Sequence, residues 1–125
     1  MAASILIVED DQPTAMAMAR ILKQAGYGVA TAPDAVLAVS TARRAPPDLV
    51  LLDLALPGGG GLAVLERIHG LANAAAVPVS VITGGSDRPE ISRAVADGEV
   101  LGVLHKPVPA EDLLAAVAVA LPPAP

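Results

Sequence analysis

The strongest constraint on this chain is the alternation of five short aliphatic runs with segments whose apolar residues recur every three or four positions. Two of the runs, SILIV and LVLL, are apolar at every position or nearly so, as expected of strands that are covered on both faces of a parallel sheet. The strands are expected at Ser4 to Val8, Val29 to Thr31, Leu49 to Leu52, Val79 to Ile82 and Val100 to Leu104.

The intervening segments read as helices. Pro13 suits a first helical turn, Asp34 suits a helix N-cap, and Pro46 and Pro47 stop the segment before them. Five βα units in succession predict an α/β fold, with a parallel sheet between two layers of helices. The helices are expected from Pro13 to Gly26, Asp34 to Arg44, Leu62 to Ile68, Glu90 to Ala96 and Leu113 to Leu121.

The composition limits the class of protein. A chain of 125 residues with 54% hydrophobic and 17% charged residues is suited to one domain, which we place at residues 1–121. Residues 122–125, PPAP, are expected to be a tail or the start of a linker. The absence of cysteine excludes disulfides and thiolate metal sites. No apolar run reaches the length of a membrane span, so we expect a cytoplasmic protein without membrane contact. The net charge of −5, without a basic cluster, argues against direct binding of nucleic acid.

Polar residues follow four of the predicted strands at the ends where ligands bind in such sheets. Glu9 and Asp10 follow the first strand, Asp53 ends the third, Thr83 ends the fourth and Lys106 follows the fifth. Two carboxylates about 5 Å apart repel each other by roughly 3 kcal/mol at an effective dielectric constant near 20. One lysine offsets this repulsion only in part, so the pattern predicts a hard divalent cation with oxygen ligands, Mg²⁺ or Mn²⁺.

These residues lie in four motifs, ILIVEDD, LLDLALPGGGGL, VITGG and LHKPV. In order and spacing the motifs resemble the receiver domain of bacterial two-component response regulators, over nearly the whole chain. The resemblance implies a flavodoxin-like, doubly wound (βα)₅ fold in three layers with strand order 2-1-3-4-5. It also implies that Asp53 accepts a phosphoryl group and that the protein is a switch rather than a turnover enzyme.

The same resemblance assigns roles to the other residues of the site. Glu9 and Asp10 would bind the metal together with Asp53 and the backbone carbonyl of Ala55. Thr83 and Lys106 would each contact a phosphoryl oxygen, and the bond between Lys106 and Pro107 would be cis. Asp11 has two possible roles, as a metal ligand in place of Glu9 or as a helix cap, and capping is favoured.

The chain departs from the family pattern around this site. Val103 stands where many receivers have a Tyr or Phe that moves when the phosphoryl group arrives, so it cannot act as an aromatic switch. We therefore expect the signal to leave through the segment from Thr83 to Glu90. The neighbouring Ala55, Gly84 and Gly85 are small, which predicts a short-lived phosphoryl group.

Two other functions remain alternatives. A phosphorylation-independent interaction module would leave the acidic cluster unused. A hydrolase acting through an aspartyl phosphate usually carries a second acid two residues after the nucleophile, where this chain has Ala55. The expected donor is a sensor histidine kinase or a phosphotransfer protein, and the effector is unknown. The segment VLGVLHKPV is similar to receivers that precede cyclic-di-GMP phosphodiesterase domains.

Overall fold

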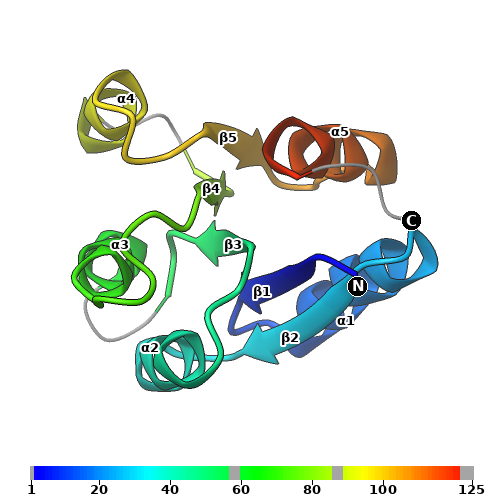
Figure 1. The fold of residues 1–125 in the computed structure, drawn as a ribbon. Helices are drawn as coiled ribbons and strands as arrows, with labels where there is room; N and C mark the ends of the chain where they lie inside the picture. Colours follow the sequence, from blue (N-terminus) through cyan, green and yellow to red (C-terminus); the bar gives the residue numbers. More distant parts are fainter. Residues whose placement is uncertain (1, 57–59, 86–88, 122–125) are drawn as a thin grey trace.

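A computed structural model describes residues 2–56, 60–85 and 89–121. Within them, strands and helices alternate along the whole chain (Figure 1). The strands are β1 (Ser4–Val8), β2 (Gly28–Ala32), β3 (Leu49–Asp53), β4 (Val79–Thr83) and β5 (Gly102–His105). The helices are α1 (Gln12–Gln24), α2 (Ala35–Arg44), α3 (Gly60–His69), α4 (Pro89–Ala96) and α5 (Ala110–Ala120).

The five strands form one parallel sheet in the order β2-β1-β3-β4-β5, as predicted. Helices α1 and α5 cover one face, and α2, α3 and α4 cover the other (Figure 1). This is the predicted three-layer arrangement. It brings the C-terminal ends of all the strands to one edge of the sheet, which is where the polar residues singled out in the sequence lie.

The apolar side chains form one cluster on each face of the sheet. Successive side chains of a strand point to opposite faces, so Ile82 joins the cluster under α1 and α5 while Val81 joins the cluster under α2, α3 and α4. The central strands β3 and β4 are buried at every position. The ends of these strands are therefore held in place by packing on both faces.

The observed β5 begins at Gly102, whereas the sequence predicted a strand from Val100. The amide of Val100 donates a hydrogen bond back to the carbonyl of Ala94, at the end of α4, and is not available to a neighbouring strand. Gly98, with φ of 78°, makes the turn that returns the chain to α4. Apolar periodicity alone does not reveal such a turn, because Val100 is buried whether it lies in a strand or in a loop.

The remaining predictions about the organisation of the chain have different outcomes. The two expected helix caps are confirmed, since the side chain of Asp34 accepts a hydrogen bond from the amide of Leu37 at 2.8 Å and that of Asp11 from the amide of Thr14 at 3.0 Å. Residues 122–125 lie outside the described residues, so their role as a tail or linker stays a prediction. Among the helices that the structure describes, none combines the length and apolar character that a membrane span requires.

Candidate functional site

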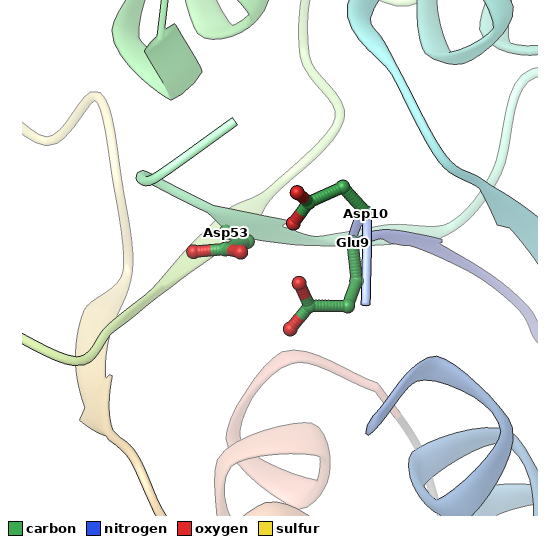
Figure 2. Close-up of side chains that lie close together, drawn as sticks. All are labelled: Glu9, Asp10 and Asp53. Carbon is green, nitrogen blue, oxygen red and sulfur yellow. The ribbon is translucent and has the colours of Figure 1, made fainter. Parts of the chain in front are cut away.

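Three carboxylates converge at the C-terminal edge of the sheet. Glu9 and Asp10 follow β1, and Asp53 is the last residue of the neighbouring β3. Figure 2 shows their carboxylates gathered at the ends of these two strands. One carboxylate oxygen from each residue lies within 4.8 Å of the other two. The predicted acidic residues are thus brought together by the register of two adjacent parallel strands.

Two of these acids are buried and share the ammonium group of one lysine. Glu9 and Asp53 are each 1% exposed, whereas Asp10 is exposed. The Lys106 ammonium lies 2.6 Å from Glu9 Oε1 and 3.3 Å from Asp53 Oδ2. A buried charge is costly unless it is paired and hydrogen-bonded. The single ammonium therefore stabilises two buried carboxylates that otherwise repel each other.

The electrostatics separate the two buried acids. Burial, together with the neighbouring Asp53, raises the pKa of Glu9 to about 7 against the opposing effect of Lys106. Burial would also raise the pKa of Asp53. The contact with Glu9, the Ala55 amide and Lys106 together outweigh this burial and hold the pKa of Asp53 below its usual value. Asp53 is consequently ionised at neutral pH and available as a nucleophile.

The acidic cluster fits a divalent cation. Glu9 Oε1 is buried and has no hydrogen-bond partner among the described residues, only the ion pair with Lys106. A buried oxygen of this kind, beside two further carboxylates, is the donor set that Mg²⁺ or Mn²⁺ takes. Ala55 lies beside it, and its amide donates a hydrogen bond to Asp53 Oδ1 at 3.0 Å. The metal-binding role of the Ala55 carbonyl stays a prediction.

Thr83 and Lys106 border the cluster from the ends of β4 and β5. Thr83 is buried, and its hydroxyl accepts a hydrogen bond from the Gly85 amide at 3.2 Å. The Lys106 amide donates to the Thr83 carbonyl at 2.8 Å, which holds the two residues side by side. The peptide bond between Lys106 and Pro107 is cis, as the family resemblance implied. All the polar residues predicted for the site therefore lie at one edge.

Asp11 belongs to helix α1. Its carboxylate accepts hydrogen bonds from both the amide and the hydroxyl of Thr14, and these bonds cap the helix. The same contacts lower the pKa of Asp11. Of the two roles weighed for this residue, capping is the one the structure supports. The backbone amide of Asp11 in turn donates to Glu9 Oε2 at 3.3 Å, so the start of α1 helps to fix the orientation of Glu9.

One structural requirement of the site was missed in the sequence. Gly61, in the first turn of α3, lies so close to the end of β3 that a Cβ atom there would be 2.8 Å from the Asp53 carbonyl oxygen and 2.8 Å from Leu54 Cα. Real Cβ atoms do not approach backbone atoms this closely. The four glycines in the motif LLDLALPGGGGL do not reveal that one of them permits this contact between α3 and the strand that carries Asp53.

Val103 faces away from α5. It is half-buried and packs against the cluster of apolar residues under α2, α3 and α4. The position therefore carries no aromatic side chain that could act as a switch, and the sequence contains no Phe or Trp.

Comparison with known proteins gives a consistent result. The family model of the response regulator receiver domain matches residues 5–118. The acid tolerance regulatory protein ActR of Rhizobium meliloti (strain 1021) is 34% identical over 114 residues, which cover 91% of this chain and 57% of that protein. Protein-glutamate methylesterase/protein-glutamine glutaminase 1 of Anaeromyxobacter dehalogenans (strain 2CP-C) is 35% identical over 108 residues, which cover 86% of this chain and 30% of that protein. The chain thus spans well under two thirds of these two curated relatives.

A solved structure matches over its whole length. The chemotaxis protein CheY4 of Vibrio cholerae superposes with a TM-score of 0.89 at 26% sequence identity, covering 97% of this chain and 100% of that one. The same architecture therefore fills that solved chain and makes up only part of the two curated relatives.

Proposed function

The chain belongs to the family of response regulator receiver domains, and from this premise we propose that it accepts a phosphoryl group on Asp53 and acts as a phosphorylation switch in two-component signalling. One observation carries the proposal. Asp53 is a buried, ionised carboxylate that lies beside Lys106 and two further acids, at the edge where ligands bind in this type of sheet.

Asp53 is the nucleophile of the proposed reaction. One of its carboxylate oxygens forms a bond to the phosphorus of a phosphohistidine, while the P–N bond breaks and its electron pair stays on the imidazole. Lys106, already 3.3 Å from Asp53 Oδ2, pairs with a phosphoryl oxygen. The Thr83 hydroxyl, which accepts a hydrogen bond from Gly85, turns to donate one to another phosphoryl oxygen.

Glu9, Asp10, Asp53 and the Ala55 carbonyl are proposed to hold Mg²⁺ or Mn²⁺. When bound, such a cation neutralises the negative charge that accumulates on the phosphoryl oxygens. Glu9 supplies a buried oxygen whose contact among the described residues is the ion pair with Lys106, and Asp10 supplies a carboxylate that is open to solvent. This arrangement supports a cation site that is closed on the protein side and open on the side where the donor arrives.

The proposed partners are a sensor histidine kinase or phosphotransfer protein as donor, and an effector that responds to the phosphoryl group. The chain matches only part of ActR and of the methylesterase, which supports an effector in the form of a linked output unit. The match over the whole CheY4 chain supports direct contact with a separate partner protein. A cyclic-di-GMP phosphodiesterase is one output that the VLGVLHKPV segment suggests. We place the protein in the cytoplasm, without membrane or nucleic-acid contact.

Switching is favoured over turnover. A hydrolase needs an acid or base to protonate its leaving group and activate water, and the position two residues after Asp53 holds Ala55, which has neither. Receiver domains are in general phosphorylation switches. The charge cost of the acidic cluster likewise disfavours an interaction module that never uses it.

The test is the gain of one phosphoryl group in intact-mass spectra after incubation with Mg²⁺ and acetyl phosphate. We expect the gain in the wild type and not in Asp53→Asn or in the presence of a chelator. Asp97→Asn, which removes an exposed carboxylate outside the acidic cluster, is the matched control and should be phosphorylated like the wild type. If no form gains mass and none binds beryllofluoride, the phosphorylation proposal is wrong and the interaction module takes its place.

A further inference from the structure

The edge of the sheet opposite the candidate site, where the strands begin, carries a pocket of about 370 Å³. It lies between the segment that leads from α3 into β4 and the turn that leads from α4 towards β5. His69, at the end of α3, fixes one wall, because its Nε2 donates a hydrogen bond to the Val77 carbonyl at 3.1 Å. None of the roles proposed above for the site residues uses this pocket.

The pocket is acidic. Asp97 and Glu99, in the turn after α4, both line it, and no lysine or arginine is among the described residues that do so. Neither carboxylate forms an ion pair with another described residue. Val79 and Leu101 supply apolar wall, and Leu101 is 47% exposed. Two carboxylates beside an apolar wall suit a cation at the end of an apolar stem, as in an arginine side chain.

The same edge carries two arginines on the far side of α3. Arg43 and Arg44 are the last residues of α2, and both are exposed. Neither forms an ion pair within the described part of the chain. The side-chain amide of Asn73, in the turn after α3, donates a hydrogen bond to the Arg43 carbonyl at 2.9 Å. This contact ties the end of α2, and so the backbone that carries both arginines, to the turn beside the pocket.

The basic and acidic groups are placed so that a two-fold rotation exchanges them. Figure 1 shows α2, α3 and α4 side by side in this order on one face of the sheet. Each of these helices returns the chain to the start of the next strand, so all three end at the same edge. A half-turn about an axis perpendicular to the sheet, beside the end of α3, exchanges the position of α2 with that of α4. Two copies joined edge to edge by this rotation bring the arginines of each to the pocket of the other.

The middle of this surface is apolar and made of small side chains. Ala72, Ala75 and Ala76 are exposed in the segment between α3 and β4, beside the end of α3 through which the axis passes. Their methyl groups let two copies approach closely without a clash of long side chains. An apolar centre with a charged rim is the usual anatomy of a protein–protein interface.

We propose that the protein forms a two-fold symmetric dimer through this edge, with Arg43 and Arg44 of each copy bound at the Asp97 and Glu99 pocket of the other. The occupant is a second copy because one chain presents both the basic group and the acidic pocket, at positions that the same rotation exchanges. The inference does not depend on the proposed function of Asp53. In this dimer the two edges that carry Asp53 point away from each other, so both stay open to a donor.

The association is expected to be weak and sensitive to salt. Ion pairs exposed to solvent each contribute little and are screened by salt. A small interface with a charged rim belongs to the transient class, so we expect dimers at protein concentrations of roughly 0.1 to 1 mM. The dissociation constant should rise roughly tenfold when NaCl is raised from about 0.05 to about 0.5 M.

The test is sedimentation equilibrium of the wild type and of two charge-reversed variants. One combines Arg43→Glu with Arg44→Glu, and the other combines Asp97→Lys with Glu99→Lys. All four positions are exposed, so both variants should fold normally. Each variant alone opposes like charges and should dimerise roughly tenfold more weakly or worse. An equimolar mixture of the two restores opposite charges at both contacts and should form a heterodimer with nearly the wild-type affinity.

The matched control is Arg20→Glu. It reverses the charge of an exposed arginine on α1, outside the proposed surface, and should dimerise like the wild type. The intact-mass measurement of phosphorylation is read separately. A failure to gain a phosphoryl group would contradict the proposed function of Asp53 and leave the dimer intact.

The remaining outcomes would each overturn the proposal. One is a wild type that stays monomeric at about 1 mM. Another is a dimer that neither variant weakens, or whose affinity the mixture does not restore, which would place the interface on another surface. A monomeric wild type that binds an arginine-rich peptide, with binding lost in the lysine variant, would instead assign the pocket to a basic partner protein.

Discussion

The two halves of the candidate site border the same space but are built differently. The acidic half, at the ends of β1 and β3, consists of Glu9, Asp10 and Asp53. The relay half, at the ends of β4 and β5, consists of Thr83, Gly84, Gly85 and Lys106, with Val103 three residues before Lys106 in β5. The acidic half holds two charges in full burial. The relay half carries its polar groups among small residues, and Gly84 and Gly85 are exposed.

This difference separates accepting a phosphoryl group from transmitting its arrival. The acidic half concentrates negative charge, which lowers the stability of the fold, and a bound ligand that neutralises this charge offsets the loss. The relay half has the hydroxyl and ammonium needed to contact that ligand, but no large side chain that would change position in response. We infer that the chemistry of the site depends on its electrostatics, and that its signal is carried by backbone segments.

The largest expected effect is in the acidic half. Glu9 has a folded-state pKa of about 7 against an ordinary value of 4.5, so the folded protein binds a proton more tightly than the unfolded chain does. The free energy of unfolding therefore falls as the pH rises from about 4.5 to about 7 and then levels off, a loss of about 3 kcal/mol at roughly 1.4 kcal/mol per pKa unit. Glu9→Gln removes this titration, and well above pH 7 it should stabilise the metal-free protein by about that amount.

Urea unfolding at a series of pH values measures the effect. The lowered pKa of Asp53 acts at pH values below its ordinary range, and the raised pKa of Lys106 acts above its own, so neither interferes between about 4.5 and 7. Saturating Mg²⁺ should reduce the advantage of Glu9→Gln, because the cation neutralises Glu9 in the wild type. If Glu9→Gln were less stable than the wild type at every pH, the free-energy cost assigned to ionised Glu9 would be contradicted.

The next prediction concerns the relay half. On binding of beryllofluoride, a mimic of the phosphoryl group, amide exchange should slow by roughly tenfold at Gly84, Gly85 and the start of α4, corresponding to about 1.4 kcal/mol of local stabilisation. Exchange in α5 should change much less. Hydrogen exchange followed by mass spectrometry distinguishes the two segments. Protection confined to α5 would show that the signal bypasses the segment from Thr83 to Glu90, part of which lies outside the described residues.

A smaller effect is expected on the lifetime of the phosphoryl group. Gly85→Met should slow dephosphorylation by roughly fivefold, about 1 kcal/mol, because the longer side chain shields the aspartyl phosphate from water. A Cβ atom at Gly85 would meet nothing within 4 Å, so the substitution is free of steric strain. Gly102→Met, equally free of contacts but outside the site, is the control. Equal phosphoryl lifetimes in both variants and the wild type would show that shielding of the aspartyl phosphate from water does not set the lifetime.

The smallest effect distinguishes two adjacent acids. Asp11→Ala removes the N-cap of α1 and should lower the free energy of unfolding by about 1 kcal/mol with little change in Mg²⁺ affinity. Asp10→Ala should abolish most Mg²⁺ binding without that loss of stability, because the exposed Asp10 side chain is part of the acidic cluster and not of the cap. Calorimetric titration with Mg²⁺ and urea unfolding of both variants provide the comparison. A loss of Mg²⁺ affinity in Asp11→Ala would place Asp11 among the ligands.

Much of this arrangement is predictable from sequence because it depends on hydrophobic periodicity and on the order of the motifs along the chain. Continuous aliphatic runs followed by polar residues predicted the strands and the sheet edge that carries the site. Asp34 and Asp11 predicted the N-terminal ends of α2 and α1. The strand order came from fold precedent, because apolar periodicity is the same for any order of buried strands. The late start of β5 depends on a turn at Gly98 that competes with strand pairing for the amide of Val100.

Other features depend on distances that a sequence does not encode. The sequence did not predict that Lys106 lies closer to Glu9 than to Asp53, because this depends on the longer Glu9 side chain reaching across from β1, and the expected contact of Lys106 with a phosphoryl oxygen stays a prediction. The close approach of Gly61 to the Asp53 backbone likewise arises from the way α3 packs onto the end of β3.

The central claim, that Asp53 is the residue that receives the phosphoryl group, is tested most directly by chemical trapping. Borohydride reduces an aspartyl phosphate to homoserine, and peptide mapping locates the product. After treatment with acetyl phosphate and Mg²⁺, the account predicts homoserine at position 53 alone, and none when the cation is chelated. Homoserine at another acidic residue, or unmodified Asp53 in protein that has gained the mass of a phosphoryl group, would contradict it.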